Sequence, residues 1–325
     1  MTVRVGVVVP CKDEVATIER CLLALRAQDP PPARVVVVDN GSTDGSLEVA
    51  RELADEVLLV PGVTISAMRN LGARALGPVD VVAFVDADCE VAPGWVAAAL
   101  GALDGSGGID GIDGIDGIDG AGGRADLAGW RSDAAPGATW VAGRWAAVEA
   151  RQRHGASYVW SQHLAIRAEL FDKLEGFDET LPTGEDIDLS RRVVEAGGRI
   201  AFEPGMAAIH HGFPGTVAGF LRRERWHTRA PGWFARMSGK SRGLVVLGAA
   251  WAATGAVAGA RTAATGDATP LAAWVLGTAA GVPVLGFAGG RSPRTALPDG
   301  VLLGLWTGVR VARLPRELVA GRGAR

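Results

Sequence analysis

Short apolar runs alternate with helical patterns over the first 85 residues, and this alternation restricts the fold more than any other feature of the chain. The runs at 5–10, 34–38 and 79–85 are rich in valine, as expected for strands that are buried on both faces. Helices are expected between them at 16–27, 46–54 and 66–76, and a further short strand at 56–60. The pattern predicts the α/β class with a doubly wound, mostly parallel sheet.

Acidic residues follow the expected strands at their carboxyl ends. Asp86 and Asp88 close the fourth strand, Asp39 follows the second, and the first leads into Pro10 and Glu14. Ligands of doubly wound sheets bind beyond these strand ends, so we expect the residues to converge on one site. Two carboxylates one residue apart suit Mg²⁺ or Mn²⁺, with coordination positions left for a substrate's phosphates. An isolated Asp-x-Asp, by contrast, is more often an ordinary acidic loop.

Composition and the first turn exclude several classes of protein. The turn after the first strand, Pro10-Cys11-Lys12-Asp13-Glu14, lacks the glycines with which a dinucleotide-binding fold approaches a pyrophosphate. The formal net charge is −3, so no nucleic-acid partner is expected. The three cysteines show no zinc-site spacing, which is consistent with a reducing compartment.

A second group of acids and a histidine pair lie further along the chain. Glu185 and Asp186 precede a helical pattern at 187–195 and should stand in its first turn, where the helix dipole stabilises anions. They could equally be an acidic helix cap. His210 and His211 follow an expected strand, and such a pair is either structural or ligates a metal.

Several motifs occur in a fixed order along the chain: Val7-Val8-Val9-Pro10 with Asp13-Glu14, Val36-Val37-Val38-Asp39-Asn40-Gly41-Ser42-Thr43-Asp44-Gly45, Arg69-Asn70-Leu71-Gly72, Asp86-Ala87-Asp88, Gly176-Phe177-Asp178-Glu179 and Gly184-Glu185-Asp186-Ile187-Asp188-Leu189. In combination, these motifs resemble those of a family 2 glycosyltransferase of the GT-A fold. The resemblance implies transfer of a sugar from a nucleotide-diphosphate sugar, such as a UDP- or GDP-sugar, to an acceptor hydroxyl with inversion. It covers about residues 3 to 215.

The resemblance also implies roles in binding the donor. Pro10 and Glu14 would line the nucleotide pocket, and Asp39 would accept hydrogen bonds from the base or ribose. Arg69 would lie near the base and phosphates. Asp86 would hold the ribose or a metal-bound water.

Metal binding and catalysis are assigned in the same way. Asp88 would bind a divalent cation, Mn²⁺ or Mg²⁺, and His210 or His211 would complete the metal shell. Asp186 matches the family's catalytic base, with Glu185 as its partner.

Two stretches depart from the family's pattern. The family often has a small residue and an asparagine where this chain has Trp160-Ser161-Gln162-His163, so an unusual acceptor subsite is expected. Ile-Asp-Gly occurs four times in tandem at 109–120, within a glycine-rich stretch at 105–123. We interpret it as a flexible surface loop, with Ca²⁺ binding as the alternative.

The last third of the chain differs in composition. Apolar segments at 244–260, 270–289 and 297–309 approach the length of a membrane span, and residues 222–242 before them carry a net charge of +6. We expect a catalytic domain at 1–240 and an apolar helical region at 241–325 that is associated with the cytoplasmic face of the membrane, with a lipid-linked acceptor. A soluble helical appendage is the alternative for this region.

Two other functions keep the same fold. A nucleotidyltransferase would favour a glycine-rich, basic turn after the first strand, where this chain offers only Lys12. The other alternative is a catalytically silent, membrane-anchored module that binds a nucleotide sugar. The intact acids at Asp88, Glu185 and Asp186 speak against that module.

Overall fold

The computed structural model describes residues 3–106, 124–152, 158–229, 239–287 and 293–320. These residues form two compact units, one from 1–138 and 149–213 and the other from 139–148 and 214–325. The units separate after Phe213, whereas the division at residue 240 rests on composition and stays a prediction. The tandem Ile-Asp-Gly repeats lie outside the described residues.

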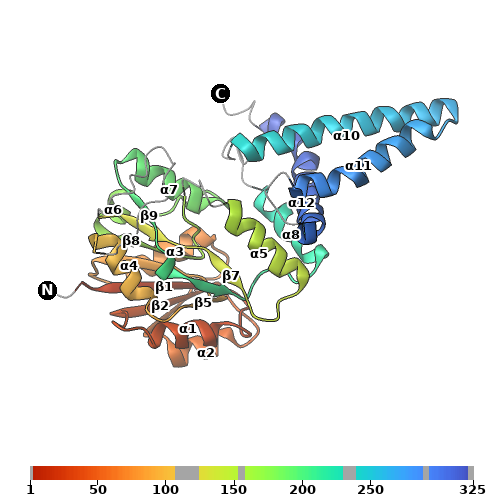
Figure 1. Cartoon of the computed structure of the whole chain (residues 1–325). Coiled ribbons are helices and arrows are strands. Elements are labelled where there is room, and N and C mark those ends of the chain that lie inside the picture. The colour runs from red at the N-terminus through yellow and green to blue at the C-terminus, as the bar shows by residue number, and fades with distance from the viewer. Residues whose placement is uncertain (1–2, 107–123, 153–157, 230–238, 288–292, 321–325) are drawn as a thin grey trace. The chain divides into compact units, whose positions relative to one another are not determined.

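A seven-stranded mixed sheet forms the centre of the first unit (Figure 1). β3, β2, β1 and β4 are parallel, β8 runs antiparallel to both β4 and β6, and β9 is parallel to β6. Val8 of β1 lies opposite Val36 and Phe84, so three buried strands meet there in register. In spatial order the strands are β3 (Glu56–Leu59), β2 (Arg34–Asp39), β1 (Val5–Cys11), β4 (Val81–Val85), β8 (His163–Arg167), β6 (Leu127–Gly129) and β9 (Ile200–Phe202).

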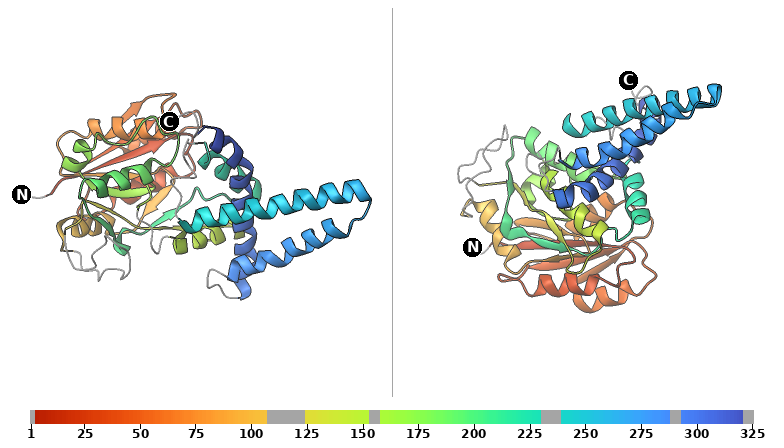
Figure 2. Two further views of the ribbon diagram at one scale, coloured as in Figure 1. Left: turned by 90° about the horizontal axis from the view of Figure 1, so that it is seen from above. Right: turned by 45° about the vertical axis from the view of Figure 1, so that its right-hand side comes forward.

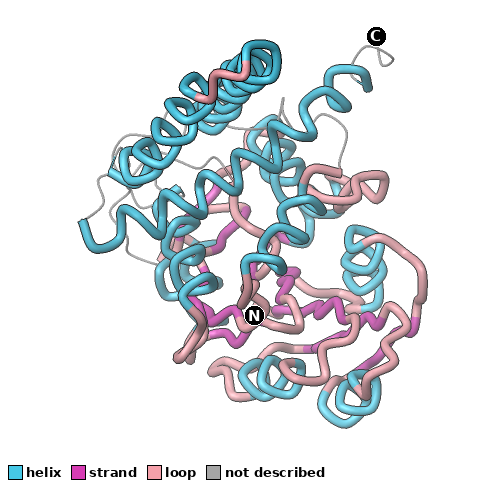
Figure 3. Tube along the Cα trace, turned by 90° about the vertical axis from the view of Figure 1, so that its right-hand side faces the viewer, coloured by secondary structure: helices cyan, strands magenta, loops and turns pink. Residues whose placement is uncertain are grey.

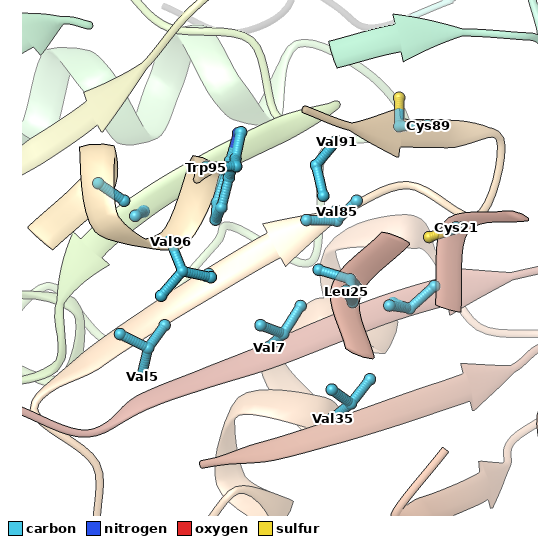
Figure 4. Close-up of a cluster of buried hydrophobic side chains, with 14 of the residues drawn as sticks. Val5, Val7, Cys21, Leu25, Val35, Val85, Cys89, Val91, Trp95 and Val96 are labelled. Carbon is cyan, nitrogen blue, oxygen red and sulfur yellow. The ribbon is translucent and has the colours of Figure 1, made fainter. Parts of the chain in front are cut away.

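Helices cover both faces of this sheet, because alternate strand residues point to opposite sides. Val7 and Val9 contribute to one apolar cluster, part of which Figure 4 shows with Trp95 and Leu25, and Val8 contributes to the other. The first face is covered by α1 (Ile18–Arg26), α2 (Ser46–Leu53) and α4 (Trp95–Asp104), and the second by α3 (Ile65–Ala75), α6 (Ala168–Lys173) and α7 (Glu185–Glu195). The unit is therefore a three-layer α/β/α fold, as the valine-rich runs predict.

A small second sheet includes β5 (Cys89–Val91), the strand that follows β4 in the sequence. It consists of β5, β10 (Ala208–His210) and β7 (Ser132–Ala134), and the short helix η1 (Pro204–Met206) precedes β10. The antiparallel pairing of β10 with β5 sets His210 opposite Cys89. This pairing brings His210, which is 122 positions later in the chain, next to Asp88 of the Asp-x-Asp motif.

The described part of the second unit is helical (Figure 3). It contains most of α5 (Trp140–Gln152), α8 (Val217–His227), α10 (Gly239–Thr265), α11 (Thr269–Phe287) and α12 (Pro293–Ala320). Two buried ion pairs join its helices. Arg144 of α5 donates two hydrogen bonds of 2.8 and 2.9 Å to Asp299 of α12, and Arg310 of α12 donates one of 2.7 Å to Glu224 of α8.

α10 and α11 run side by side as a hairpin (Figure 2). The Trp251 indole donates to the Thr278 hydroxyl at 2.9 Å, and the Trp274 indole donates to the carbonyl of Trp251 at 3.0 Å. Within the described residues, one helical stretch, Arg242–Thr265 of α10, is long and apolar enough to cross a membrane, and few of its side chains are buried. Leu247 and Val257 on it are each 69% exposed.

The Arg144–Asp299 pair gives a stability prediction. Asp299 is fully buried, and Arg144→Met would remove both guanidinium hydrogen bonds from its carboxylate. We expect the free energy of unfolding of the full chain to fall by about 3–5 kcal/mol, as for other broken buried pairs. Thermal or chemical unfolding measures this loss.

The matched control is Arg191→Met, because Arg191 is 55% exposed and its ion pairs lie at the surface. That change should cost about 1 kcal/mol or less. The double variant Arg144→Met with Asp299→Leu should regain most of the stability lost. A loss for Arg144→Met no larger than that of the surface control would contradict the assignment.

Candidate functional site

Arg69 of α3 connects the two acidic motifs. Its side chain is buried, with 1% of the residue exposed. Nη2 donates to Asp86 Oδ1 at 2.6 Å, and Nη1 donates to Glu185 Oε1 at 2.7 Å. One guanidinium therefore holds the end of β4 against the start of α7, although the two acids are 99 positions apart in the sequence.

The rest of the motif 69–72 explains why Arg69 reaches this position. A Cβ on Gly72 would collide with Val8 of β1, so only glycine lets α3 pack this close to the sheet. The Asn70 amide donates to the carbonyl of Phe177 at 2.9 Å and accepts from the Phe177 N–H at 2.9 Å. Gly176, just before this contact, has φ +73°, a conformation that favours glycine.

Ser161 is a member of this site to which the sequence assigned no role. Its hydroxyl donates to the same Glu185 Oε1 at 2.9 Å, and its carbonyl lies 3.5 Å from Arg69 Nη2. The next residue, Gln162, accepts a backbone hydrogen bond of 2.8 Å from Asp86. The departure from the family's pattern at 160–163 was the only signal in the sequence that pointed to this stretch.

Asp186 lies in the first turn of α7, where the sequence places it. It is 9% exposed, and its Oδ1 accepts from the N–H of Ile187 at 2.8 Å. Burial, together with the charge of Glu185, raises the pKa of Asp186 to about 7. A carboxyl group with such a pKa can take up a proton near neutral pH, as a general base must.

The second acid of the Asp-x-Asp motif lies against a histidine. Asp88 Oδ2 is 2.9 Å from His210 Nε2, and ligand atoms of Asp88, Cys89 and His210 lie within 4.8 Å of one another. Carboxylates are crowded here, and burial together with the charge of Asp88 raises the pKa of Glu14 to about 6. Burial and the charge of Asp88 likewise raise the pKa of Asp86 to about 6, in opposition to Arg69.

This donor set fits a hard divalent cation held by an oxygen and an imidazole nitrogen. The excess of carboxylates is what Mg²⁺ or Mn²⁺ would neutralise. The Cys89 thiol suits such an ion poorly, because burial and Asp88 raise its pKa well above the ordinary value and keep it protonated. His211 faces elsewhere, since its Nε2 lies 2.9 Å from Glu90 Oε2.

Asp39 and Pro10 lie on neighbouring strands beside these residues. Pro10 is in β1 opposite Val38, and Asp39, the last residue of β2, lies opposite Cys11. Asp39 is fully buried, and its Oδ1 accepts from the N–H of Ser42 at 2.8 Å. Its Oδ2 is enclosed and has no hydrogen-bond partner within the described part of the chain. A buried carboxylate oxygen of this kind can accept a hydrogen bond from a ligand.

The structure thus brings most of the expected residues to one edge of the sheet. Arg69, expected beside the base and phosphates, has both terminal nitrogens bonded to carboxylates, and its donor-binding role stays a prediction. Of the two candidate histidines, the structure brings His210 and not His211 to the Asp88 side chain. The roles assigned to Pro10, Glu14 and Asp39 stay predictions.

The adjacent histidines provide a matched test of the metal site. Because His210 contacts Asp88 and His211 contacts Glu90, His210→Ala should weaken Mn²⁺ binding by about tenfold or more, and His211→Ala should leave it within about twofold. Calorimetric titration or electron paramagnetic resonance of Mn²⁺ with each variant measures the affinity. Equal losses in the two variants, or a larger loss in His211→Ala, would contradict the assignment.

Comparisons with known proteins agree with this fold. The Pre-mycofactocin glycosyltransferase of Mycobacterium tuberculosis is 29% identical over 251 residues, which are 76% of this chain and 51% of that protein. The Glycosyltransferase AglE of Haloferax volcanii is 26% identical over 218 residues, 65% of this chain and 67% of that protein. The chain therefore spans about half the length of the mycobacterial relative.

A solved structure and a family profile complete the comparison. The mannosyltransferase PcManGT of Pyrobaculum calidifontis, in complex with GDP-Man and Mn²⁺, superposes with a TM-score of 0.61 at 20% identity, over 95% of this chain and 87% of that one. This likeness confirms the expected GT-A fold. Residues 6–174 match the profile described as glycosyl transferase family 2. On the residues that it matches, the chain belongs to glycosyl transferase family 2.

Proposed function

We propose that this chain transfers a sugar from a nucleotide-diphosphate sugar to an acceptor hydroxyl, with inversion and with the assistance of a divalent cation. The observation that carries the proposal is the Arg69 bridge, which joins the Asp-x-Asp motif to the first turn of α7. Because of this bridge, the acids proposed to bind the donor and the acid proposed to act on the acceptor belong to one site.

The donor is proposed to be a UDP- or GDP-sugar. Asp39 Oδ2 is buried at the end of β2 and has no partner in the described chain, which supports a hydrogen bond from the base or the ribose to this oxygen. Pro10 and Glu14 on the neighbouring strand end would line the same pocket. The mannosyltransferase of the same fold was solved with GDP-Man and Mn²⁺, which supports this donor class and ion.

A divalent cation, Mn²⁺ or Mg²⁺, would be held by Asp88 and His210. When bound, it would neutralise the diphosphate as the nucleotide leaves. Other residues of the chain would surround and position this cation site. Glu14 and Asp86 border the cation position, and Arg69 keeps Asp86 in place.

The acceptor side depends on Asp186 and Glu185. In a single displacement the acceptor oxygen attacks the anomeric carbon, the bond from that carbon to the diphosphate oxygen breaks, and the hydroxyl proton moves to a base. Asp186 is proposed as this base, since its raised pKa of about 7 suits proton uptake at neutral pH. Glu185, fixed by Arg69 and Ser161, would keep the first turn of α7 in position.

The membrane association is part of the proposal. The apolar stretch of α10 exposes large side chains, including Leu247 and Val257, and supports insertion into a bilayer. The basic residues at 222–242 favour the cytoplasmic face, where they would meet anionic lipid headgroups. A lipid-linked acceptor would fit this location.

Asp186→Asn tests the base. Turnover should fall by about 10²–10⁴-fold, the contribution of general base catalysis, because an amide cannot accept the hydroxyl proton. The affinity for UDP or GDP with Mn²⁺ should stay within about twofold. Sugar release or transfer from UDP- and GDP-sugars measures the turnover, and calorimetry measures the affinity.

The control for this test is Asp188→Asn, two residues further along α7, where the carboxylate binds Arg191 and Arg192. It should keep most of the turnover. Near wild-type turnover in Asp186→Asn would show that the base is another group.

Cell fractionation tests the membrane association. The full chain should sediment with membranes and stay there after an alkaline wash, because the exposed apolar residues of α10 would lie in lipid. Val257→Asp, in the middle of that stretch, should release part of the protein. Full recovery of the wild-type chain in the soluble fraction without detergent would contradict this part of the proposal.

A further inference from the structure

A buried chain of four polar side chains ends beside the site and has no part in the mechanism above. The Trp95 indole nitrogen lies 3.3 Å from His163 Nδ1, and His163 Nε2 lies 3.0 Å from Ser132 Oγ. Ser132 Oγ lies 3.0 Å from Gln162 Oε1. The residues His163, Ser132 and Gln162 are 1%, 2% and 7% exposed.

The chemistry of these groups fixes the direction of the first two bonds. An indole N–H can only donate, so His163 Nδ1 accepts and its Nε2 carries the proton. That proton goes to Ser132 Oγ, and the serine hydroxyl donates to Gln162 Oε1. This bond leaves the Nε2 end of the Gln162 amide for another acceptor.

The consequence is an amide nitrogen that is available to a ligand. Gln162 is 7% exposed, and its Nε2 makes no hydrogen bond in the part of the chain that the structure describes, although the atom is not fully enclosed. An amide N–H in this situation can donate to a bound group. Gln28, the matched case, is 5% exposed and bonds Ala24, Ala92 and Val96 through both ends of its amide.

Gln162 lies between the two acidic motifs. Its backbone carbonyl accepts from the N–H of Asp86 at 2.8 Å, and the hydroxyl of the preceding Ser161 donates to Glu185. The backbone at 161–162 therefore contacts one acid of each motif. An amide N–H beside these acids would be the complementary donor for the oxygen of a neutral hydroxyl.

We propose that Gln162 determines donor specificity by donating a hydrogen bond from Nε2 to a hydroxyl of the transferred sugar, with Trp95, His163 and Ser132 as the positioning residues. This inference rests on the proposed function. It predicts that the amide contributes to binding of a nucleotide sugar and not to binding of the nucleoside diphosphate alone, which lacks the sugar.

Gln162→Met tests this role because methionine keeps the length of the side chain and removes the amide. With Mn²⁺ present, calorimetry would compare GDP-mannose with GDP and UDP-glucose with UDP. We expect the affinity of the preferred nucleotide sugar to fall about 5- to 20-fold, as for loss of one buried hydrogen bond, and that of its nucleoside diphosphate to stay within twofold.

Two further variants separate specificity from folding. Ser132→Ala removes the hydrogen bond that positions the Gln162 amide. It should also lower the affinity for the nucleotide sugar relative to the nucleoside diphosphate, by a smaller factor than Gln162→Met. Gln28→Met should lower the melting temperature and leave the ratio of the two affinities unchanged.

The affinity ratio of Gln162→Met decides the inference. If Gln162→Met leaves the affinity ratio as in the wild type, or weakens the nucleoside diphosphate equally, the inference is overturned. A wild-type chain that binds neither nucleotide with Mn²⁺ contradicts the proposed function itself, and the inference falls with it.

Discussion

The contact between the Arg69 guanidinium and two carboxylates organises the catalytic unit. A buried charge is tolerated only with partners, and Arg69 has Asp86 on one side and Glu185 on the other. Removing either acid would leave a buried cation with half its compensation. Helix α3, the end of β4 and the start of α7 are thereby fixed to one another, and Gly72 lets α3 come close enough to the sheet for this to happen.

Because of this contact, the two acids of each motif have different surroundings. In the Asp-x-Asp motif, Asp86 binds Arg69, and Asp88 is turned toward His210. In the motif at the start of α7, Glu185 binds Arg69, and Asp186 is left with a raised pKa. One acid of each motif holds the structure together. The other is proposed to act on the cation or on the acceptor proton.

The sequence predicted the parts of the fold that are rich in local signal. The valine-rich strands and the helix start at Glu185 agree with the structure to within a few residues, because burial on both faces and a first turn of acids are local patterns. The antiparallel strand β8 and the small sheet were not predicted, since strands of three to five residues carry little periodicity. The choice of His210 over His211, and the partners of Arg69, depend on pairing between distant segments, which no local pattern encodes.

One shared site for cation, diphosphate and base is the central proposal for this chain. Crystals grown with Mn²⁺ and GDP or UDP, measured at a wavelength where manganese scatters anomalously, test this most directly. We predict an anomalous peak in bonding contact with Asp88 and His210, with the diphosphate between the peak and Asp186. A peak at Glu90 and His211, or a nucleotide bound away from the end of β4, would contradict the account.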